Sequence, residues 1–188
     1  MSAKRYFGKY RGNVLNNIDP MNRARIQAQV AAVSSLLPST WCEPCVPLAG
    51  IQMGAYFVPQ IGAGVWIEFE QGDPTRPIWT GCFWGSMAEV PALALAGVPA
   101  SPSIVLQTAG QNTLMISDVP GAVGGMLLKS GTVTVSISDT GITMLNEGAM
   151  ISMIAGVVTT TNGSGATITL GPGPAVAVNV DALVVDGP

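Results

Sequence analysis

The sequence GVWIEFEQGDPTRPIWTGCFW, residues 64–84, decides the fold of the first half of the chain. Its first seven residues alternate, so that Val65, Ile67 and Phe69 lie on one face of a strand. Gln71-Gly72-Asp73-Pro74 is rich in residues that form turns, and an apolar run with two further aromatic residues follows it. The stretch therefore predicts a β-hairpin with one buried face.

Two further strands are expected on the N-terminal side of this hairpin. Lys9–Asn16 forms the first, and Ile18-Asp19-Pro20 after it is typical of a turn. Arg25–Val33 alternates as well, and its apolar face is expected to consist of Ile26, Ala28, Val30 and Ala32. Five or so strands in roughly 85 residues, with no convincing helical period, predict a small closed barrel of the OB type.

The composition changes sharply after Glu89. All four tryptophans and all three tyrosines precede residue 85, and seven of the eight Lys and Arg residues lie within the first 76 positions. Such a shift marks a domain boundary. We expect residues 1–88 to form the barrel domain, the proline-rich residues 89–102 to be a linker, and residues 103–188 to form a second domain.

The second domain is expected to consist of short strands alone. Residues 132–138 (TVTVSIS), 165–170 (GATITL) and 175–180 (AVAVNV) alternate between apolar and hydroxyl-bearing or small residues, and glycines separate the strands. About eight to ten strands emerge at a spacing of roughly 8–12 residues. No aromatic residue is present to fill a thick core.

A thin core of Val, Ile, Ala and Met suits a β-helix or β-prism in which three chains share one axis. Chains that wind together would also use up the free strand edges that otherwise favour aggregation. The sequence therefore predicts an all-β protein, with an N-terminal OB-fold barrel followed by a C-terminal trimeric β-helix or β-prism spike. A monomeric β-sandwich is the alternative for the second domain.

The composition excludes several classes of protein. Charged residues make up only 10% of the 188 residues, against roughly 25% in ordinary soluble domains, which favours a surface covered by other copies of the chain. The net charge of −3 argues against a protein dominated by nucleic-acid binding. The longest apolar stretch, Val90–Ala100, is interrupted by prolines and cannot span a membrane, and no secretory signal is expected at the N-terminus. The absence of histidine removes the commonest general base and metal ligand, and we expect no enzyme activity and no cofactor.

Several blocks of the first half occur in an order and spacing that carry a resemblance. These blocks are YFGKYRGNVLNNIDPMNRARIQAQV, WCEPCVPLAG and GVWIEFEQGDPTRPIWTGCFW. Together they resemble the OB domain of phage baseplate central spike proteins, a group that includes baseplate assembly protein V and the valine-glycine repeat proteins of type VI secretion. The resemblance covers about residues 6–84. It implies that the barrel, the hub contact and the trimer contact involve Tyr10, Arg11, Gly12, Asp19, Pro20, Arg25, Trp41, Pro44, Cys45, Pro47, Gly50, Gly64, Trp66, Glu68, Gly72, Asp73, Pro74, Pro77, Trp79, Gly81 and Trp84.

The resemblance also implies a function and partners. The chain would form a homotrimer that docks on the trimeric baseplate hub and leads the tail tube through the target cell envelope, touching the membrane only transiently. It would assemble in the cytoplasm and then belong to a phage virion or a contractile injection particle. Lysozyme inserts and His-x-His iron sites found in some relatives have no counterpart here. A separate PAAR-type tip protein would dock at the C-terminus, at Val184, Val185, Asp186, Gly187 and Pro188.

Trp41-Cys42-Glu43-Pro44-Cys45 has the spacing of a thioredoxin redox motif. That chemistry requires Cys42 at the start of a helix, and Val46-Pro47-Leu48-Ala49-Gly50 does not predict a helix. A zinc site would need a fourth ligand in addition to Cys42, Cys45 and Cys82. We therefore expect buried, inert thiols.

Three other patterns leave alternatives open. The basic and aromatic residues of Lys4–Arg11 could bind single-stranded nucleic acid, as OB barrels often do, or face an acidic partner. Glu68, Glu70 and Asp73 could form a catalytic carboxylate cluster, but salt bridges to Arg23, Arg25 or Arg76 of a neighbouring copy are favoured. The Thr- and Ser-rich strand faces are expected to form the solvated exterior of the shaft, although they could bind glycans.

Overall fold

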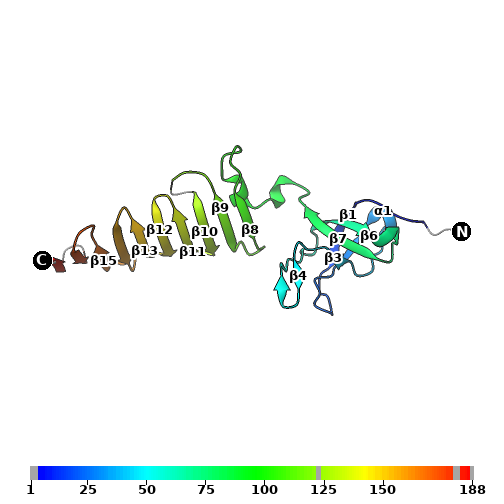
Figure 1. The fold of residues 1–188 in the computed structure, drawn as a ribbon, viewed down its shortest axis with the longest axis horizontal. Coiled ribbons are helices and arrows are strands. Elements are labelled where there is room, and N and C mark those ends of the chain that lie inside the picture. Colours follow the sequence, from blue (N-terminus) through cyan, green and yellow to red (C-terminus); the bar gives the residue numbers. More distant parts are fainter. Residues whose placement is uncertain (1–3, 122–123, 180–182, 187–188) are drawn as a thin grey trace. The chain divides into compact units, whose positions relative to one another are not determined.

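The computed structural model describes residues 4–121, 124–179 and 183–186, with side chains up to residue 179. The chain divides into two units, residues 1–89 and 90–188, and each folds around its own sheet. Strands make up 45% of the chain and helices only 8%, which confirms the all-β prediction (Figure 1). None of the helices among the described residues has the length or apolar character needed to cross a membrane.

The first unit is a small barrel. Its sheet has the order β2-β1-β6-β7-β3. The first unit contains, in chain order, β1 (Tyr10–Asn16), β2 (Gln27–Gln29), α1 (Ala31–Ser34), β3 (Glu43–Pro44), β4 (Ala49–Gly50), β5 (Met53–Gly54), β6 (Gly64–Phe69), η1 (Glu70–Gly72), β7 (Pro77–Phe83) and η2 (Met87–Glu89).

The segment around β3 closes the sheet. Glu43 and Pro44 pair with β7, and Cys42 forms an antiparallel bridge with Ile26 just before β2. The Cys42 amide donates to the Ile26 carbonyl at 2.7 Å. The two outer strands are therefore joined through this segment, as an OB-type barrel requires.

The barrel core comes from the alternating residues of these strands. Val65 and Ile67 of β6 are fully buried, as the sequence predicts, and Val14, Ile26 and Trp79 pack against them. The Trp79 indole Nε1 donates to the Ala24 carbonyl at 3.0 Å, which satisfies its polar group inside the barrel.

The prediction of a strand over residues 25–33 is wrong for the second half of that range. Strand pairing ends at Gln29, and α1 follows, in which the amides of Val33 and Ser34 donate to the Val30 carbonyl at 2.9 and 3.0 Å. Ala32 is exposed and does not belong to the apolar face. Alanine has a low strand propensity, so the two alanines after Val30 do little to prolong the strand.

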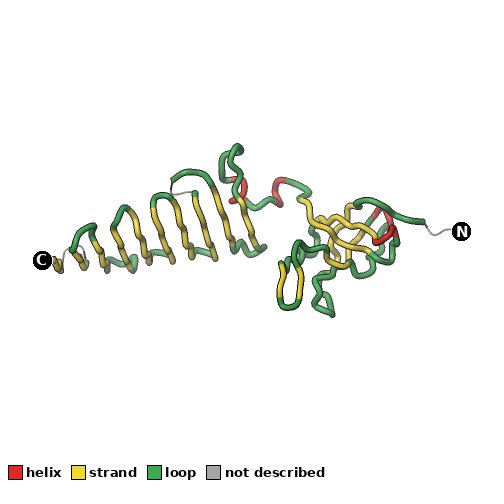
Figure 2. The backbone as a smooth tube through the Cα atoms, viewed as in Figure 1, coloured by secondary structure: helices red, strands yellow, loops and turns green. Residues whose placement is uncertain are grey.

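The second unit is one antiparallel meander. Its ten strands pair with their chain neighbours in strict sequence order from β8 to β17 (Figures 1 and 2). They are β8 (Ile104–Gln107), β9 (Thr113–Ser117), β10 (Gly125–Ser130), β11 (Val133–Ser138), β12 (Gly141–Asn146), β13 (Ala149–Ile154), β14 (Val157–Thr161), β15 (Thr167–Leu170), β16 (Ala175–Val178) and β17 (Leu183–Asp186). The short helix η3 (Ala92–Leu95) lies next to β8 at the start of the unit.

The strands of the second unit change length along the sheet. Four consecutive strands, β10 to β13, have six residues each, and the last three have four. Glycine is required where the backbone of β10 begins close to that of β11. Gly125 has a φ of +80°, and a Cβ atom there would lie 2.0 Å from the Ile137 carbonyl oxygen. Because its last strands are the shorter ones, the sheet narrows toward its C-terminal end (Figure 1).

Candidate interaction surfaces

One face of the ten-stranded sheet is apolar along nearly its whole length. Directly paired residues lie on the same face of a sheet, so the register defines ladders that run across the strands. The first ladder is Ile104, Ile116, Met126, Ile137, Ile142, Met153, Val158, Leu170 and Val176. The second is Leu106, Leu114, Leu128, Val135, Met144, Ile151, Thr160, Ile168 and Val178. In β17 the backbone register continues them at Val185 and Leu183.

We call these two ladders the apolar face of the shaft. In a single chain this face is uncovered: Ile104 is 65% exposed, Leu128 53% and Met144 48%. No second layer packs on it among the described residues, and Figure 2 shows no helix over the sheet beyond η3. A continuous apolar surface of this extent marks an interaction site.

The opposite face is different in its middle section. There the central ladder consists of Ser136, Thr143, Ser152, Thr159 and Thr169. At the base of the sheet the same ladder starts with Val105, Met115 and Leu127. Leu93 and residues 96–98 around η3 line, together with Met115 and Leu127, a partly open apolar pocket of about 470 Å³. The hydroxyl-bearing ladder is therefore the part of this face that suits contact with water, while Leu145 and Met150 pair beside it on the same face.

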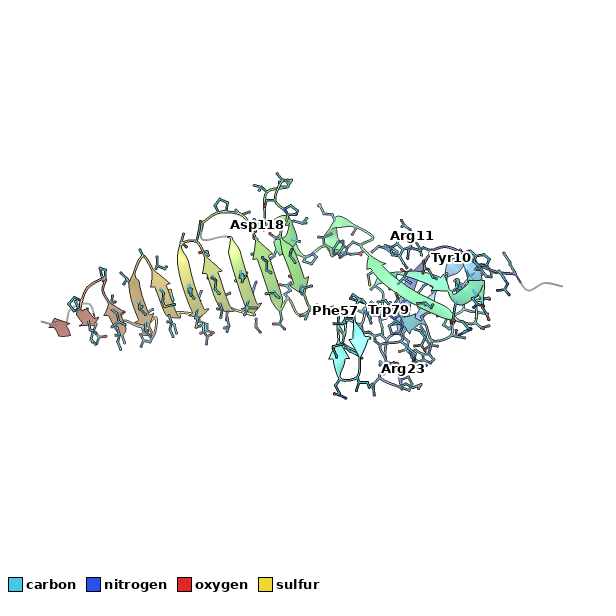
Figure 3. The ribbon with its side chains drawn as sticks, viewed as in Figure 1. Tyr10, Arg11, Arg23, Phe57, Trp79 and Asp118 are labelled. Carbon is cyan, nitrogen blue, oxygen red and sulfur yellow. The ribbon has the colours of Figure 1, made fainter. Side chains whose placement is uncertain are left out.

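The outer wall of the barrel carries a stack of one cation and two aromatic rings. The Arg11 guanidinium lies 5.3 Å from the Trp66 ring centroid and 5.0 Å from that of Phe83. Arg11 is exposed and forms no salt bridge among the described residues (Figure 3). Stacking on both rings holds its planar group in place while leaving its donors available to an acidic partner.

A second exposed surface of the barrel unit is apolar and uncharged. The β4–β5 hairpin and the residues after it present Ile51, which is 98% exposed, together with Met53, Tyr56 and Phe57 (Figure 3). None of these four residues was among the sites predicted from the sequence. The signal was available, because no charged residue occurs between Glu43 and Glu68.

Two predicted site residues of the loop between β1 and β2, Asp19 and Arg25, meet a third, Trp41, from the segment before β3. The Asp19 carboxylate accepts hydrogen bonds from the amides of Met21 and Arg23, at 2.9 and 2.8 Å, and from the Arg25 guanidinium at 2.6 Å. The Arg25 guanidinium beside it holds the pKa of Asp19 well below its usual range. Arg25 also lies 5.4 Å from the Trp41 ring centroid. This cluster fixes a loop and is largely buried, with the Asp19 side chain only 3% exposed.

The carboxylates of the 64–84 hairpin are paired inside the chain. Glu68 lies 3.0 Å from Lys9, and Glu70 lies 2.7 Å from Arg76. Asp73 accepts hydrogen bonds from the Thr75 amide and hydroxyl, which lower its pKa. These carboxylates therefore already have partners within the chain, and salt bridges to a neighbouring copy stay a prediction.

The arginines of the β1–β2 loop are likewise paired within the chain. Arg23 reaches Glu43 at 2.9 Å, and Arg25 reaches Asp19. The basic and aromatic residues before and at the start of β1 also have partners within the chain. Tyr6 and Tyr10 pack on Phe69, with ring centroids 5.9 and 5.5 Å away.

The three cysteines lie in different surroundings. Cys42 is buried in the bridge that closes the barrel, and its burial raises the pKa of its thiol. No helix starts at Cys42, so the geometry of a thioredoxin motif is absent. Cys45 and Cys82 are exposed, contrary to the expectation of buried thiols. The described residues include no group of His, Cys, Asp and Glu side chains that could hold a metal.

The other predicted barrel residues divide by exposure. Those buried in the barrel wall are Gly12, Gly64, Gly72, Pro77 and Trp79. Those half-buried are Tyr10, Pro44, Trp66, Glu68, Asp73 and Gly81. Those exposed are Arg11, Pro20, Cys45, Pro47, Gly50, Pro74 and Trp84. Of the C-terminal positions, Gly187 and Pro188 lie outside the described residues, and Val184, Val185 and Asp186 are described by backbone only.

Comparison with known proteins gives two matches. Residues 10–84 match the family model of the type VI secretion system and phage-baseplate injector OB domain. Residues 103–159 match the phage baseplate V C-terminal trimerisation domain. A search of curated proteins finds no match. The first match covers the barrel sheet, and the second covers the apolar face of the shaft from β8 into β14.

Proposed function

The chain belongs to the baseplate spike protein family, and on that premise we propose that it is the central spike of a contractile tail or contractile injection machine. In this role it docks on the baseplate hub through its barrel and pierces the target envelope with its shaft. The observation that carries the proposal is the apolar face, which runs across all ten strands and is uncovered in one chain.

Three chains would cover this face. The match of residues 103–159 to a trimerisation domain supports a homotrimer, and the apolar face supplies the surface that would be buried in it. Each chain pairs all its strands within itself, so each chain can supply one side of a prism. This arrangement needs no strand of a sister chain between its own strands. The hydroxyl-bearing faces would then form the wet exterior.

The shaft would be stiff along the direction in which the strands stack. Hydrogen bonds between strands run perpendicular to the strands, and therefore along that direction. A load on the tip would press on hydrogen-bonded strands and on the close-packed core between the three sheets. The narrowing of the sheet concentrates that load on a small end.

The barrel offers two surfaces for the hub. The exposed Arg11, held between Trp66 and Phe83, suits an acidic group, and the uncharged surface around Ile51 suits an apolar one. Residues 1–88 would serve as the docking domain, residues 89–102 as the connection and residues 103–188 as the spike.

The C-terminal end would accept a separate tip protein. β17 is the last strand of the sheet, and its outer edge pairs with no other described strand. An unpaired edge at the end of a stack is a site that another protein can cover. This proposal covers Val184 to Pro188 and includes a PAAR-type partner. We propose assembly in the cytoplasm, with the mature protein in a virion or an injection particle.

Light scattering on the purified protein tests the proposal. A homotrimer of the 19.3 kDa chain has a mass of about 58 kDa, three times that of one chain. We expect this mass across a wide range of protein concentration, because the apolar face cannot stay exposed to water. A mass near that of one chain would overturn the spike. Salt-dependent binding of oligonucleotides by such a monomer would instead indicate an OB-type nucleic-acid-binding protein.

A further inference from the structure

One residue interrupts the apolar face of the shaft. Thr160 in β14 pairs with Ile151 on one side and Ile168 on the other, and every other residue of the two ladders is apolar. Within the described residues its hydroxyl has no hydrogen-bond partner, whereas the Thr161 hydroxyl accepts a bond from the Gly163 amide at 3.1 Å. The neighbouring Thr159 lies on the opposite, hydroxyl-bearing face, where it pairs with Ser152 and Thr169.

We propose that Thr160 fixes the axial register of the three chains in the shaft. This inference rests on the homotrimer of the proposed function. The occupants of the face are therefore two further copies of the same chain. The trimerisation-domain match ends at Thr159, and beyond Thr160 the apolar face continues into β15 and β16.

The rest of the apolar face cannot set the register by itself. Strands in a sheet are about 4.7–4.9 Å apart, and nearly every step of this one presents two apolar side chains. A chain displaced along the axis by one or more steps would still bury apolar surface against apolar surface. Hydrophobic association is non-directional and does not distinguish such arrangements.

A hydroxyl group does distinguish the trimer in register from trimers with a displaced chain. In the symmetric trimer the three Thr160 side chains lie at one level, where they can bond one another or a trapped water. In a displaced trimer each hydroxyl lies among isoleucine and leucine side chains and loses its partners, which is costly for a buried polar group. A single polar residue in an apolar seam specifies register in coiled coils by the same principle.

The test uses the signals of labelled methionine methyl groups in the full-length protein. Met144 and Met153 belong to the ladders near Thr160, and Met21 and Met53 lie in the barrel unit. A symmetric trimer gives one signal for each methionine, because the three copies are equivalent. In Thr160→Val we expect extra signals for Met144 and Met153 as displaced chains become populated, while the signals of the barrel methionines stay single.

Two matched variants isolate the hydroxyl. Thr159→Val makes the same substitution on the opposite face of the same strand, and Thr160→Ser keeps the hydroxyl; both should retain single signals. We also expect Thr160→Val to raise the thermal midpoint, since a polar group leaves an apolar core. Single signals in Thr160→Val, or extra signals in Thr160→Ser, would overturn the register role. If the unmodified protein had the mass of one chain, the proposed function would fail first, and light scattering separates that outcome from this one.

Discussion

The charged side chains of the barrel act mainly within the chain, and Asp19 has the most partners. Its carboxylate accepts hydrogen bonds from three backbone amides and the Arg25 guanidinium, in a loop where Asn22 and Ala24 adopt left-handed backbone conformations, with φ of 52° and 61°. Such conformations are unfavourable for alanine and persist only when the surroundings hold them. Asp19 therefore positions the loop from which Arg25 reaches Trp41 and to whose backbone Trp79 bonds.

Replacing this carboxylate should destabilise the barrel and change its response to acid. In Asp19→Asn we expect the thermal midpoint at neutral pH to fall by several degrees, because the amide cannot form the charge-assisted bonds to Arg25. The folded pKa of Asp19 lies below its unfolded value, so its contribution is complete above about pH 4 and is lost as the pH falls further. The variant should therefore lose less stability than the unmodified protein between about pH 4 and pH 2.

Tryptophan fluorescence measures this directly, because all four tryptophans lie in the barrel unit. Asp118→Asn, at an exposed position in the second unit, is the control and should leave the fluorescence transition unchanged. Equal acid sensitivity of Asp19→Asn and the unmodified protein would show that other carboxylates control acid unfolding of the barrel.

Strand faces could be predicted from alternation wherever one face is buried. Val65, Ile67 and Phe69 alternate in the sequence, and all three are buried in β6. The same pattern failed at Ala32, because alternating alanines carry too little side chain to distinguish a strand from a short helical turn. The closure of the barrel through the Cys42–Ile26 bridge could not be predicted, since it depends on pairing between segments that the sequence does not relate.

The surfaces were predicted less well than the elements. Arg11 and Trp66 were candidates through the family resemblance, but their stacking with Phe83 depends on the register of β1 on β6 and β6 on β7. The alternation of residues 132–138 predicted an apolar and a hydroxyl-bearing face in the second unit. Whether the apolar face continues from strand to strand depends on the register at every turn. The sequence pattern does not define that register, and the structure does.

The two faces of β12 allow a matched test of which one is buried between chains. Ile142 lies on the apolar face, between Ile137 and Met153, and Thr143 lies on the opposite face, between Ser136 and Ser152. Ile142→Asp should abolish the trimer, because an unpaired carboxylate buried in an apolar core costs about 4 kcal/mol or more. Thr143→Asp places the same charge on the hydroxyl-bearing face and should leave the mass at that of a trimer.

Sedimentation velocity on both variants distinguishes the faces. If Thr143→Asp dissociated the protein and Ile142→Asp did not, the chains would associate through the hydroxyl-bearing face. If neither variant dissociated, contacts of the barrel unit would have to hold the trimer together.

At the scale of the whole molecule, the two units divide the tasks of the spike. No strand of one unit pairs with a strand of the other among the described residues, and each unit has its own apolar surface. The barrel buries its apolar residues within one chain, around Ile26, Val65 and Ile67. The second unit leaves its apolar face exposed in a single chain, and in the proposed trimer the other copies would cover it.

This division predicts opposite behaviour of the two halves when they are produced separately. Residues 1–89 should fold as a monomer, since their core is complete without a partner. Residues 90–188 should form a trimer or, below the concentration at which it assembles, lose ordered structure, because a single sheet with one uncovered apolar face is not stable alone. Light scattering and circular dichroism on each fragment measure both properties. A trimeric barrel fragment would show that residues 1–89 contribute an interface of their own, with Arg11 and the surface around Ile51 as the first residues to substitute. A folded, monomeric fragment 90–188 would contradict the shared core and favour the β-sandwich, in which one chain covers its own apolar face.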